Sequence, residues 1–311
     1  MALPATKNPY PVSITLTSPH LEAQISPFGA ELVRLRDEVG HDLLWDGDPA
    51  FWTGRSPLLF PIVGRLKGDR VLIGGTEYSL KQHGFARNSQ FEVVETGQTS
   101  CCLRLRASPL TRQQYPFDFE LEVTYRIDGS RLTIEASIRN TGPQVMPVSF
   151  GFHPAFRWPL PYGGGREEHE IRFERAETEP LRPLVDGLLG LGTRQTPVRG
   201  DTLRLQDELF DEGALVFDRV SSRAVEYGVP GQRSLKITFP NMPHLGIWTK
   251  PGAGFICIEP WQGYASPVDF EGELADKPGI VLVDPGNTRR LSMEISVLGP
   301  YELCREGCLH T

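Results

Sequence analysis

The sequence contains no run of about 18 apolar residues, so no membrane-spanning helix is expected. It also lacks a basic cluster, and 39 acidic against 32 basic side chains give a formal net charge of −7. That charge balance argues against a nucleic-acid or anionic-membrane partner. The N-terminus has no charged segment followed by an apolar one, so no signal peptide is expected.

Disulfide and zinc signatures are also missing. The count of cysteines is odd, and they are Cys101, Cys102, Cys257, Cys304 and Cys308. Without a signal peptide, they are predicted to be reduced thiols of a cytoplasmic protein. Cys304 and Cys308 lie near His310, but no further ligands follow at a suitable spacing, so no metal is expected at this end.

Helical periodicity is almost absent, and short helical turns are expected only near residues 48–52 and 108–115. Alternating or β-branched segments bounded by Gly, Pro, Asn or Asp run through the rest of the sequence. Asp128-Gly129 and Gly74-Gly75 each predict a hairpin turn. The pattern therefore predicts an all-β fold of the sandwich or jelly-roll type.

The chain is expected to form a single domain over residues 1–311. Residues 160–200 are rich in Gly, Pro and charge and resemble a linker. Because strand patterns of the same type continue on both sides, we expect a long irregular connection within one domain instead.

Nucleotide-binding and serine-hydrolase motifs are absent, so candidate chemistry rests on polar residues where strands end. Glu259 follows the apolar run 255–258 and precedes Pro260. Burying a carboxylate costs several kcal/mol unless it is paired or protonated, so Glu259 is predicted to face a pocket. His153 likewise lies between an apolar run and a proline.

Three further side chains join these candidates: Arg65, His83 and Arg87. Each one alone is compatible with a turn, a buried histidine or a structural ion pair. Together with His153 and Glu259 they suit general acid–base chemistry on a polar small molecule. A metal triad of dispersed His and Glu residues stays open, although no two histidines have a paired-ligand spacing. A glycosidase would need two carboxylates, and only Glu259 is predicted to lie in a pocket.

Four motifs in order, FPIVGRL, QHGFAR, GFHPAF and IWTKPGAGFICIEPW, resemble the aldose 1-epimerase (galactose mutarotase-like) family. The resemblance extends from about Ile14 to Leu298 and is greatest to the shorter, LacX-like branch. It implies an antiparallel β-supersandwich, in agreement with the all-β pattern. It also implies an isomerase that interconverts the α and β anomers of a free aldohexose, with no cofactor and no metal.

The resemblance assigns roles to individual residues. His153 matches the general acid toward the ring oxygen, and Glu259 matches the general base on the anomeric hydroxyl. His83 and Arg65 match residues that hold the sugar. The family also has a sugar-contacting aspartate in the third quarter of the chain, for which Asp211 is the nearest candidate here.

Two other functions stay open. The HGFAR motif also occurs in hexose-6-phosphate 1-epimerases, where arginines hold the phosphate, and Arg87 keeps that function open. A non-catalytic sugar-binding protein of the same fold is the third possibility. In any of these, aromatic side chains are expected to stack on the apolar face of the sugar; the candidates are Trp261, Trp158, Phe156 and Phe85. Neither the particular sugar nor the oligomeric state follows from the sequence.

Overall fold

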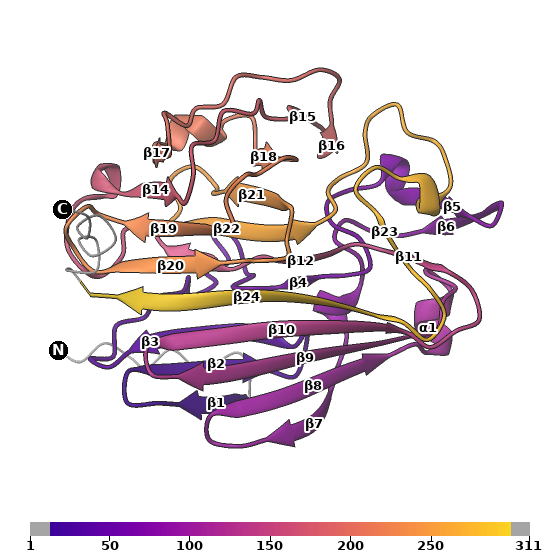
Figure 1. Cartoon of the computed structure of the whole chain (residues 1–311), viewed down its shortest axis with the longest axis horizontal. Coiled ribbons are helices and arrows are strands. Elements are labelled where there is room, and N and C mark those ends of the chain that lie inside the picture. Colours follow the sequence, from indigo (N-terminus) through magenta and orange to yellow (C-terminus); the bar gives the residue numbers. More distant parts are fainter. Residues whose placement is uncertain (1–12, 300–311) are drawn as a thin grey trace, which may run out of the picture.

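The computed structural model describes residues 13–299, in which β-strands form nearly all of the regular structure (Figure 1). The largest sheet has nine antiparallel strands, with β24 near its middle between β20 and β10. In spatial order they are β17 (Thr202–Arg204), β14 (Glu170–Phe173), β19 (Ala224–Gly228), β20 (Ser234–Thr238), β24 (Thr288–Leu298), β10 (Arg131–Asn140), β9 (Phe119–Asp128), β8 (Ser100–Arg106) and β7 (Glu92–Thr96).

A second, six-stranded sheet carries the candidate site. Its order is β18 (Leu215–Phe217), β21 (His244–Trp248), β22 (Phe255–Gln262), β12 (Phe150–Phe152) and β4 (Leu58–Leu59), with β13 (Ala155–Arg157) also paired to β22. A three-stranded sheet contains β1 (Ile14–Thr17), β2 (Leu21–Ser26) and β3 (Glu31–Asp37). Three small ribbons pair β5 (Arg70–Ile73) with β6 (Thr76–Ser79), β11 (Met146–Val148) with β23 (Val281–Val283), and β15 (Leu184–Val185) with β16 (Leu188–Leu189).

The helices are few and short. The described chain has one α-helix, α1 (Pro109–Arg112), and the 3-10 turns η1 (Lys67–Asp69), η2 (Ala86–Asn88), η3 (Arg166–Glu168), η4 (Asp207–Phe210) and η5 (Leu274–Asp276). No helix within residues 13–299 has the length and apolar character that crossing a bilayer requires.

Alternate residues of the central strands build one continuous hydrophobic core between the sheets. Val123 on β9, Ile134 on β10 and Met293 on β24 point into it from the large sheet, and Ile256 and Ile258 on β22 meet them from the six-stranded sheet. Burying each such side chain contributes roughly 1.5–3 kcal/mol. This period-two burial in antiparallel sheets confirms the all-β prediction.

Most of the predicted turns are present. The hairpins at Asp128-Gly129 and Gly74-Gly75 are confirmed, and they join β9 to β10 and β5 to β6. α1 lies in the predicted segment, and the side chain of Ser108, the residue before it, caps its N-terminus. Residues 48–52 form a turn closed by the Asp48 carbonyl and do not form a helix.

The Gly- and Pro-rich segment 160–200 packs on the sheets rather than leaving them. It contains β14, an interior strand of the large sheet, and the β15–β16 ribbon. Leu181 and Leu189 within it are fully buried. The cysteines at positions 304 and 308 and His310 lie outside the described residues.

A buried imidazole ties this segment to the fold. His169 Nδ1 lies 2.8 Å from the Gly165 carbonyl oxygen and donates to it, and the Leu160 N–H donates to His169 Nε2 at 3.0 Å. A proton on Nε2 would remove the acceptor that Leu160 needs. Burial accordingly lowers the pKa of His169 below its ordinary value of 6.5.

His169 should therefore make stability depend on pH. Below about pH 6.5, His169 is protonated in the unfolded chain but stays largely unprotonated in the folded chain, because its folded-state pKa is lower. The free energy of unfolding therefore falls as the pH falls. Above that pH the contribution is fully present. Urea unfolding between about pH 7 and 5 should show a shallower pH dependence for His169→Gln than for the wild type. Parallel curves for the two proteins would contradict this role.

Candidate active site

The strand β22 has two buried faces of different character. Ile256 and Ile258 point into the main core, whereas Cys257, Glu259 and Trp261 point to the opposite face of the six-stranded sheet. All eight residues of β22 are buried because loops cover that second face. Side chains therefore alternate between a purely apolar environment and a mixed one that includes a carboxylate.

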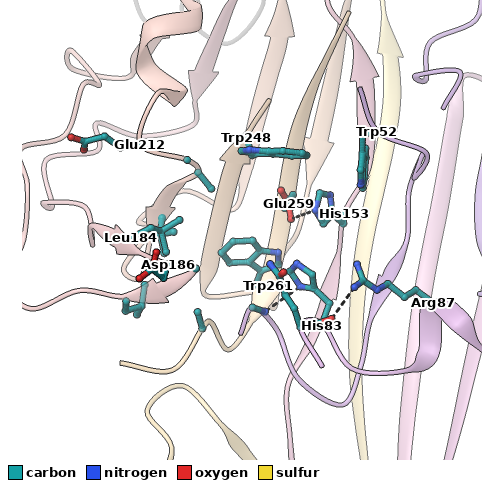
Figure 2. A pocket seen from close by; sticks show the side chains of 18 residues that line it. Trp52, His83, Arg87, His153, Leu184, Asp186, Glu212, Trp248, Glu259 and Trp261 are labelled. Carbon is teal, nitrogen blue, oxygen red and sulfur yellow. Dashed lines mark hydrogen bonds and ion pairs between the residues drawn. The ribbon is translucent and has the colours of Figure 1, made fainter. Parts of the chain in front are cut away.

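A cavity of about 440 Å³ lies on this second face (Figure 2). Its floor comes from β18, β21 and β22, and its walls come from the loops around residues 52, 82–87, 153, 184–189 and 212–214. The lining residues are Trp52, Gly64, Gln82, His83, Arg87, His153, Leu184, Asp186, Gly187, Leu189, Glu212, Gly213, Ala214, Val216, Trp248, Glu259, Trp261 and Ala265. A cavity of this size suits a small polar ligand.

His153 and Glu259 meet because of strand register. Gly151 on β12 is opposite Trp261, and Ala155 on β13 is opposite Cys257, so the residue between them, His153, is opposite Glu259. Directly opposed side chains on antiparallel neighbours lie close together. His153 Nε2 is 3.2 Å from Glu259 Oε2. The exposed fraction is only 6% for His153 and 2% for Glu259.

Burial determines how this pair holds protons. It lowers the pKa of His153 to about 3, and the positive charge of Arg87 acts in the same direction. Burial also raises the pKa of Glu259 well above its ordinary carboxyl value, with the Trp261 indole N–H partly opposing that shift. Both shifts favour the uncharged forms, a carboxylic acid and a neutral imidazole, in which the pair holds a single proton.

His83 enters the cavity from a tight turn. It has a left-handed backbone (φ 67°), which is unusual for a residue with a side chain and costs of order 1–3 kcal/mol. Its backbone N–H donates to the Gly64 carbonyl at 2.9 Å, and its ring Nδ1 accepts the Gly64 N–H at 3.1 Å. Burial lowers its pKa well below 6.5, so the ring is neutral and carries its proton on Nε2. The imidazole is therefore a fixed hydrogen-bond donor beside His153, with ring centroids 5.7 Å apart.

The turn that holds His83 depends on the next residue. Gly84 is also left-handed (φ 69°), and a Cβ at this position would lie 2.2 Å from the Phe60 carbonyl oxygen. Only glycine allows this approach. The turn that places His83 in the cavity thus explains why glycine follows histidine in the QHGFAR motif.

Charges are unevenly distributed around the cavity. Arg87 lies on one side of the central pair, where its guanidinium donates to the Gln82 carbonyl at 2.9 Å. Asp186 and Glu212 lie on the other side (Figure 2). Glu212 also pairs with Arg194 at 3.1 Å. Arg87 is the one cationic side chain among the lining residues of the described chain.

Three tryptophans supply the flat walls. Trp52 stacks on the His153 ring with centroids 5.0 Å apart, and Trp248 meets both at right angles. Trp261 lies beside Glu259 on the same strand. Of the predicted stacking candidates, Trp261 lines the cavity, whereas Trp158, Phe156 and Phe85 belong to the main core.

The indole of Trp261 fits a slot that two glycines leave open. A Cβ on Gly246 would lie 2.3 Å from Cη2 and Cζ2 of the ring, and a Cβ on Gly151 would lie 2.6 Å from Cδ1. Gly246 is also the β21 residue opposite Glu259, so the carboxylate has no side-chain neighbour on that strand.

Two of the predicted site residues lie outside the cavity. Arg65 was expected on its wall, but its guanidinium binds Asp69 at 3.0 Å and the Asp186 carbonyl at 3.3 Å, so it supports the β15–β16 ribbon from behind. Asp211 is exposed at the end of η4, and its neighbour Glu212 faces the cavity instead. The cavity does bring together His83, Arg87, His153, Glu259 and Trp261.

Several residues that line the cavity were not predicted from the sequence to belong to the site. Trp248 alternates with the core residues Leu245 and Ile247 on β21, and this period-two pattern was a readable signal for a side chain on the site face. Asp186 and Trp52 lie in loops, where no periodicity indicates which way a side chain points.

Several known proteins are similar to this chain in sequence and structure. The family model for aldose 1-epimerase matches residues 12–296. Two LacX proteins of Lactococcus lactis subsp. lactis, plasmid and chromosomal, are each 30% identical over 298 residues, covering 92% of this chain and 100% of theirs. A solved galactose mutarotase related enzyme from Lactobacillus acidophilus has a TM-score of 0.87 at 29% identity, covering 94% of this chain and 99% of its own. A galactose mutarotase-like protein from Lactobacillus casei has a TM-score of 0.86 at 25% identity, covering 92% and 100%.

Proposed function

Because the chain belongs to the aldose 1-epimerase family, we propose that it is a mutarotase that interconverts the α and β anomers of a free aldohexose. The family match confirms the resemblance seen in the four sequence motifs. The observation that carries the proposal is the contact of 3.2 Å between His153 Nε2 and Glu259 Oε2, two buried side chains that line the cavity. Simple sugar binding does not require an acid and a base at this distance.

The reaction needs two proton transfers at neighbouring oxygens of the sugar. Glu259 takes the proton of the C1 hydroxyl while His153 donates its proton to the ring oxygen. The bond between C1 and the ring oxygen breaks, and C1 becomes an aldehyde carbon. Rotation about the C1–C2 bond presents the other face, and the reversed transfers close the ring.

The shared proton makes this sequence self-restoring. Ring opening moves the pair from carboxylate and imidazolium, the state that burial disfavours, to carboxylic acid and imidazole, the state that burial favours, and closure moves it back. The pair is uncharged overall in both states, so the buried site never has to accommodate a net charge. In the charged state the two groups stabilise each other across 3.2 Å in a medium of low polarity.

His83 and the tryptophans position the sugar for these transfers. The Nε2–H of His83 is a fixed donor for the ring oxygen or a hydroxyl next to it. Trp52, Trp248 and Trp261 offer apolar surfaces for the C–H face of a hexose and exclude water from the pair.

The charge distribution favours a neutral sugar over a phosphorylated one. Arg87 supports the hexose-6-phosphate alternative, but it is already bonded to the Gln82 carbonyl, and Asp186 and Glu212 face it across the cavity. A phosphate dianion would meet one cation and the Asp186 carboxylate, whereas the exposed Glu212 carboxylate is paired with Arg194. Carboxylates accept hydrogen bonds from sugar hydroxyls without that repulsion.

Exchange spectroscopy by NMR tests the proposal over a panel of sugars. The anomers of free aldohexoses, galactose and glucose among them, should interconvert faster with the protein than in buffer. The protein should accelerate the interconversion of hexose 6-phosphate anomers by a smaller factor. Greater acceleration with the hexose 6-phosphates than with the free sugars would instead support a hexose-6-phosphate 1-epimerase that uses Arg87. Binding of a sugar without acceleration would promote the non-catalytic alternative.

His83→Asn should weaken sugar binding and turnover together. Asn tolerates the left-handed backbone of residue 83, so the turn is kept. Its side chain is shorter than that of His, so it no longer places a hydrogen-bond donor where His83 Nε2–H lies. We expect kcat/KM to fall by roughly 10- to 100-fold, the effect of one lost hydrogen bond to a polar group of the substrate. Michaelis kinetics from the same NMR assay separate the two parameters. A pure effect on turnover with unchanged KM would contradict a positioning role.

A further inference from the structure

A thiol lies next to the catalytic pair without taking part in the reaction proposed above. Cys257 is on the same face of β22 as Glu259, two residues away, and is opposite Ala155 and Trp248 on the neighbouring strands. Its sulfur, a Glu259 oxygen and a His153 ring nitrogen all lie within 4.8 Å of one another. All three residues are buried.

The spacing of these atoms matches a tetrahedral metal site. Zinc binds N and O ligands at about 2.0–2.2 Å and sulfur at about 2.3 Å, which places N and O about 3.3 Å apart and S about 3.6 Å from either. His153 Nε2 and Glu259 Oε2 are already 3.2 Å apart. Because no ligand atom of the three is farther than 4.8 Å from another, shifts of about 1 Å would bring them to these separations.

Two of these groups have unused bonding capacity. In the described chain, Glu259 Oε2 has no hydrogen-bond partner beyond its contact with His153 Nε2, and the other ring nitrogen of His153, Nδ1, has none. The Trp52 ring packs on the His153 ring and fixes its orientation. The site thus offers one imidazole, one carboxylate and one thiol in a rigid arrangement.

From this geometry we infer that Cys257, His153 and Glu259 bind a zinc ion, which inhibits the enzyme by occupying the proton-transferring pair. His153 and Glu259 line the cavity, so the fourth coordination position faces the space that a sugar would fill (Figure 2). The ion and the sugar therefore compete. The inhibition rests on the proposed function, whereas the binding of zinc does not.

The ligand set also determines which ions bind. One thiolate and one imidazole select zinc, cadmium and cobalt, whereas magnesium and calcium prefer sites made of oxygen alone. Activity should therefore fall in micromolar zinc and stay unchanged in millimolar magnesium. A chelator should restore activity and should not remove it.

The binding experiment uses the full chain with Cys304 and Cys308 changed to Ser, so that thiols near the C-terminus do not contribute. Calorimetric titration with zinc should give one site per chain, and titration with cobalt should give a sulfur-to-cobalt charge-transfer band. Cys257→Ala should abolish the band and weaken zinc binding by roughly 100-fold or more. The matched control is Cys101→Ala, a buried thiol on β8 in the other sheet, which should leave both signals unchanged.

Each outcome supports or overturns the zinc site. No zinc binding, or binding that Cys257→Ala and Cys257→Ser leave unchanged, overturns it. Binding with the cobalt band but without inhibition of an active enzyme overturns the placement of the ion at the pair. If the protein accelerates no sugar, the cobalt band and the calorimetry still test the site, so failure of the proposed function is recognised separately.

Discussion

Glu259→Gln is expected to lower the rate of anomer exchange at saturating sugar by about 10²–10⁴-fold, and His153→Asn by a similar factor. Gln keeps the shape of Glu259 but cannot accept the C1 hydroxyl proton, and Asn at position 153 cannot deliver one to the ring oxygen. Sugar affinity should fall far less, because His83, Arg87 and the tryptophans still surround the ligand. NMR exchange rates at saturating and subsaturating sugar measure the two effects separately.

The double variant gives a sharper result than either single one. Because one ring opening uses both groups at once, Glu259→Gln combined with His153→Asn should lose little beyond the more damaging single change. Two independent contributions would instead multiply. Glu177→Gln is the matched control: this glutamate is also buried, but it binds the backbone N–H groups of Ser221 and Ser222 away from the cavity. It should affect stability and leave turnover unchanged.

Gly246→Ala is expected to lower kcat/KM by about 100-fold while the fold is retained. The new methyl group would overlap the Trp261 ring, because its carbon would lie only 2.3 Å from the nearest ring atoms. The ring has to move by about 1 Å, and a displacement of that size beside a catalytic group can cost about 10²-fold. Movement of the indole also disturbs Glu259, which is two residues away and directly opposite Gly246.

A double-mutant cycle identifies the cause of that loss. Trp261→Phe removes the part of the ring that meets residue 246, so Gly246→Ala should cost much less in the Trp261→Phe background. Gly97→Ala is a control for the substitution itself, since its methyl group would have only an ordinary contact at 3.7 Å. Equal losses from Gly246→Ala in both backgrounds would show that the slot around Trp261 is not the reason.

The sequence predicted the parts of the site that strands determine. Glu259 was predicted to lie where its strand ends, whereas β22 continues through Pro260 to Gln262, so Glu259 and Trp261 share one face of it because side chains alternate along a strand. The polar residue after an apolar run identified Glu259, and the proline after His153 indicated a strand that stops near it. The contact between them was not predictable from either segment alone, because it depends on the register of β12 and β13 against β22.

The differences between the predicted and the observed site residues arise mainly in loops. Arg65 follows β4 in a segment whose direction is fixed by contacts with Asp69 and Asp186, and the latter is 121 residues away in the chain. Asp186 and Glu212 reach the cavity from loops without periodicity, so nothing local distinguished Glu212 from Asp211. Trp158 and Phe156 were candidates for stacking on a sugar, but alternation and the turn after β13 direct both into the core.

The buried pair of His153 and Glu259 is proposed to transfer protons to and from a free sugar. Two-dimensional exchange NMR on equilibrated aldohexoses tests this role most directly, because it measures the interconversion of anomers without a coupled enzyme. We expect exchange above the buffer rate for the wild type and a rate close to that of buffer for Glu259→Gln. Exchange by Glu259→Gln as fast as by the wild type would contradict the proposed role.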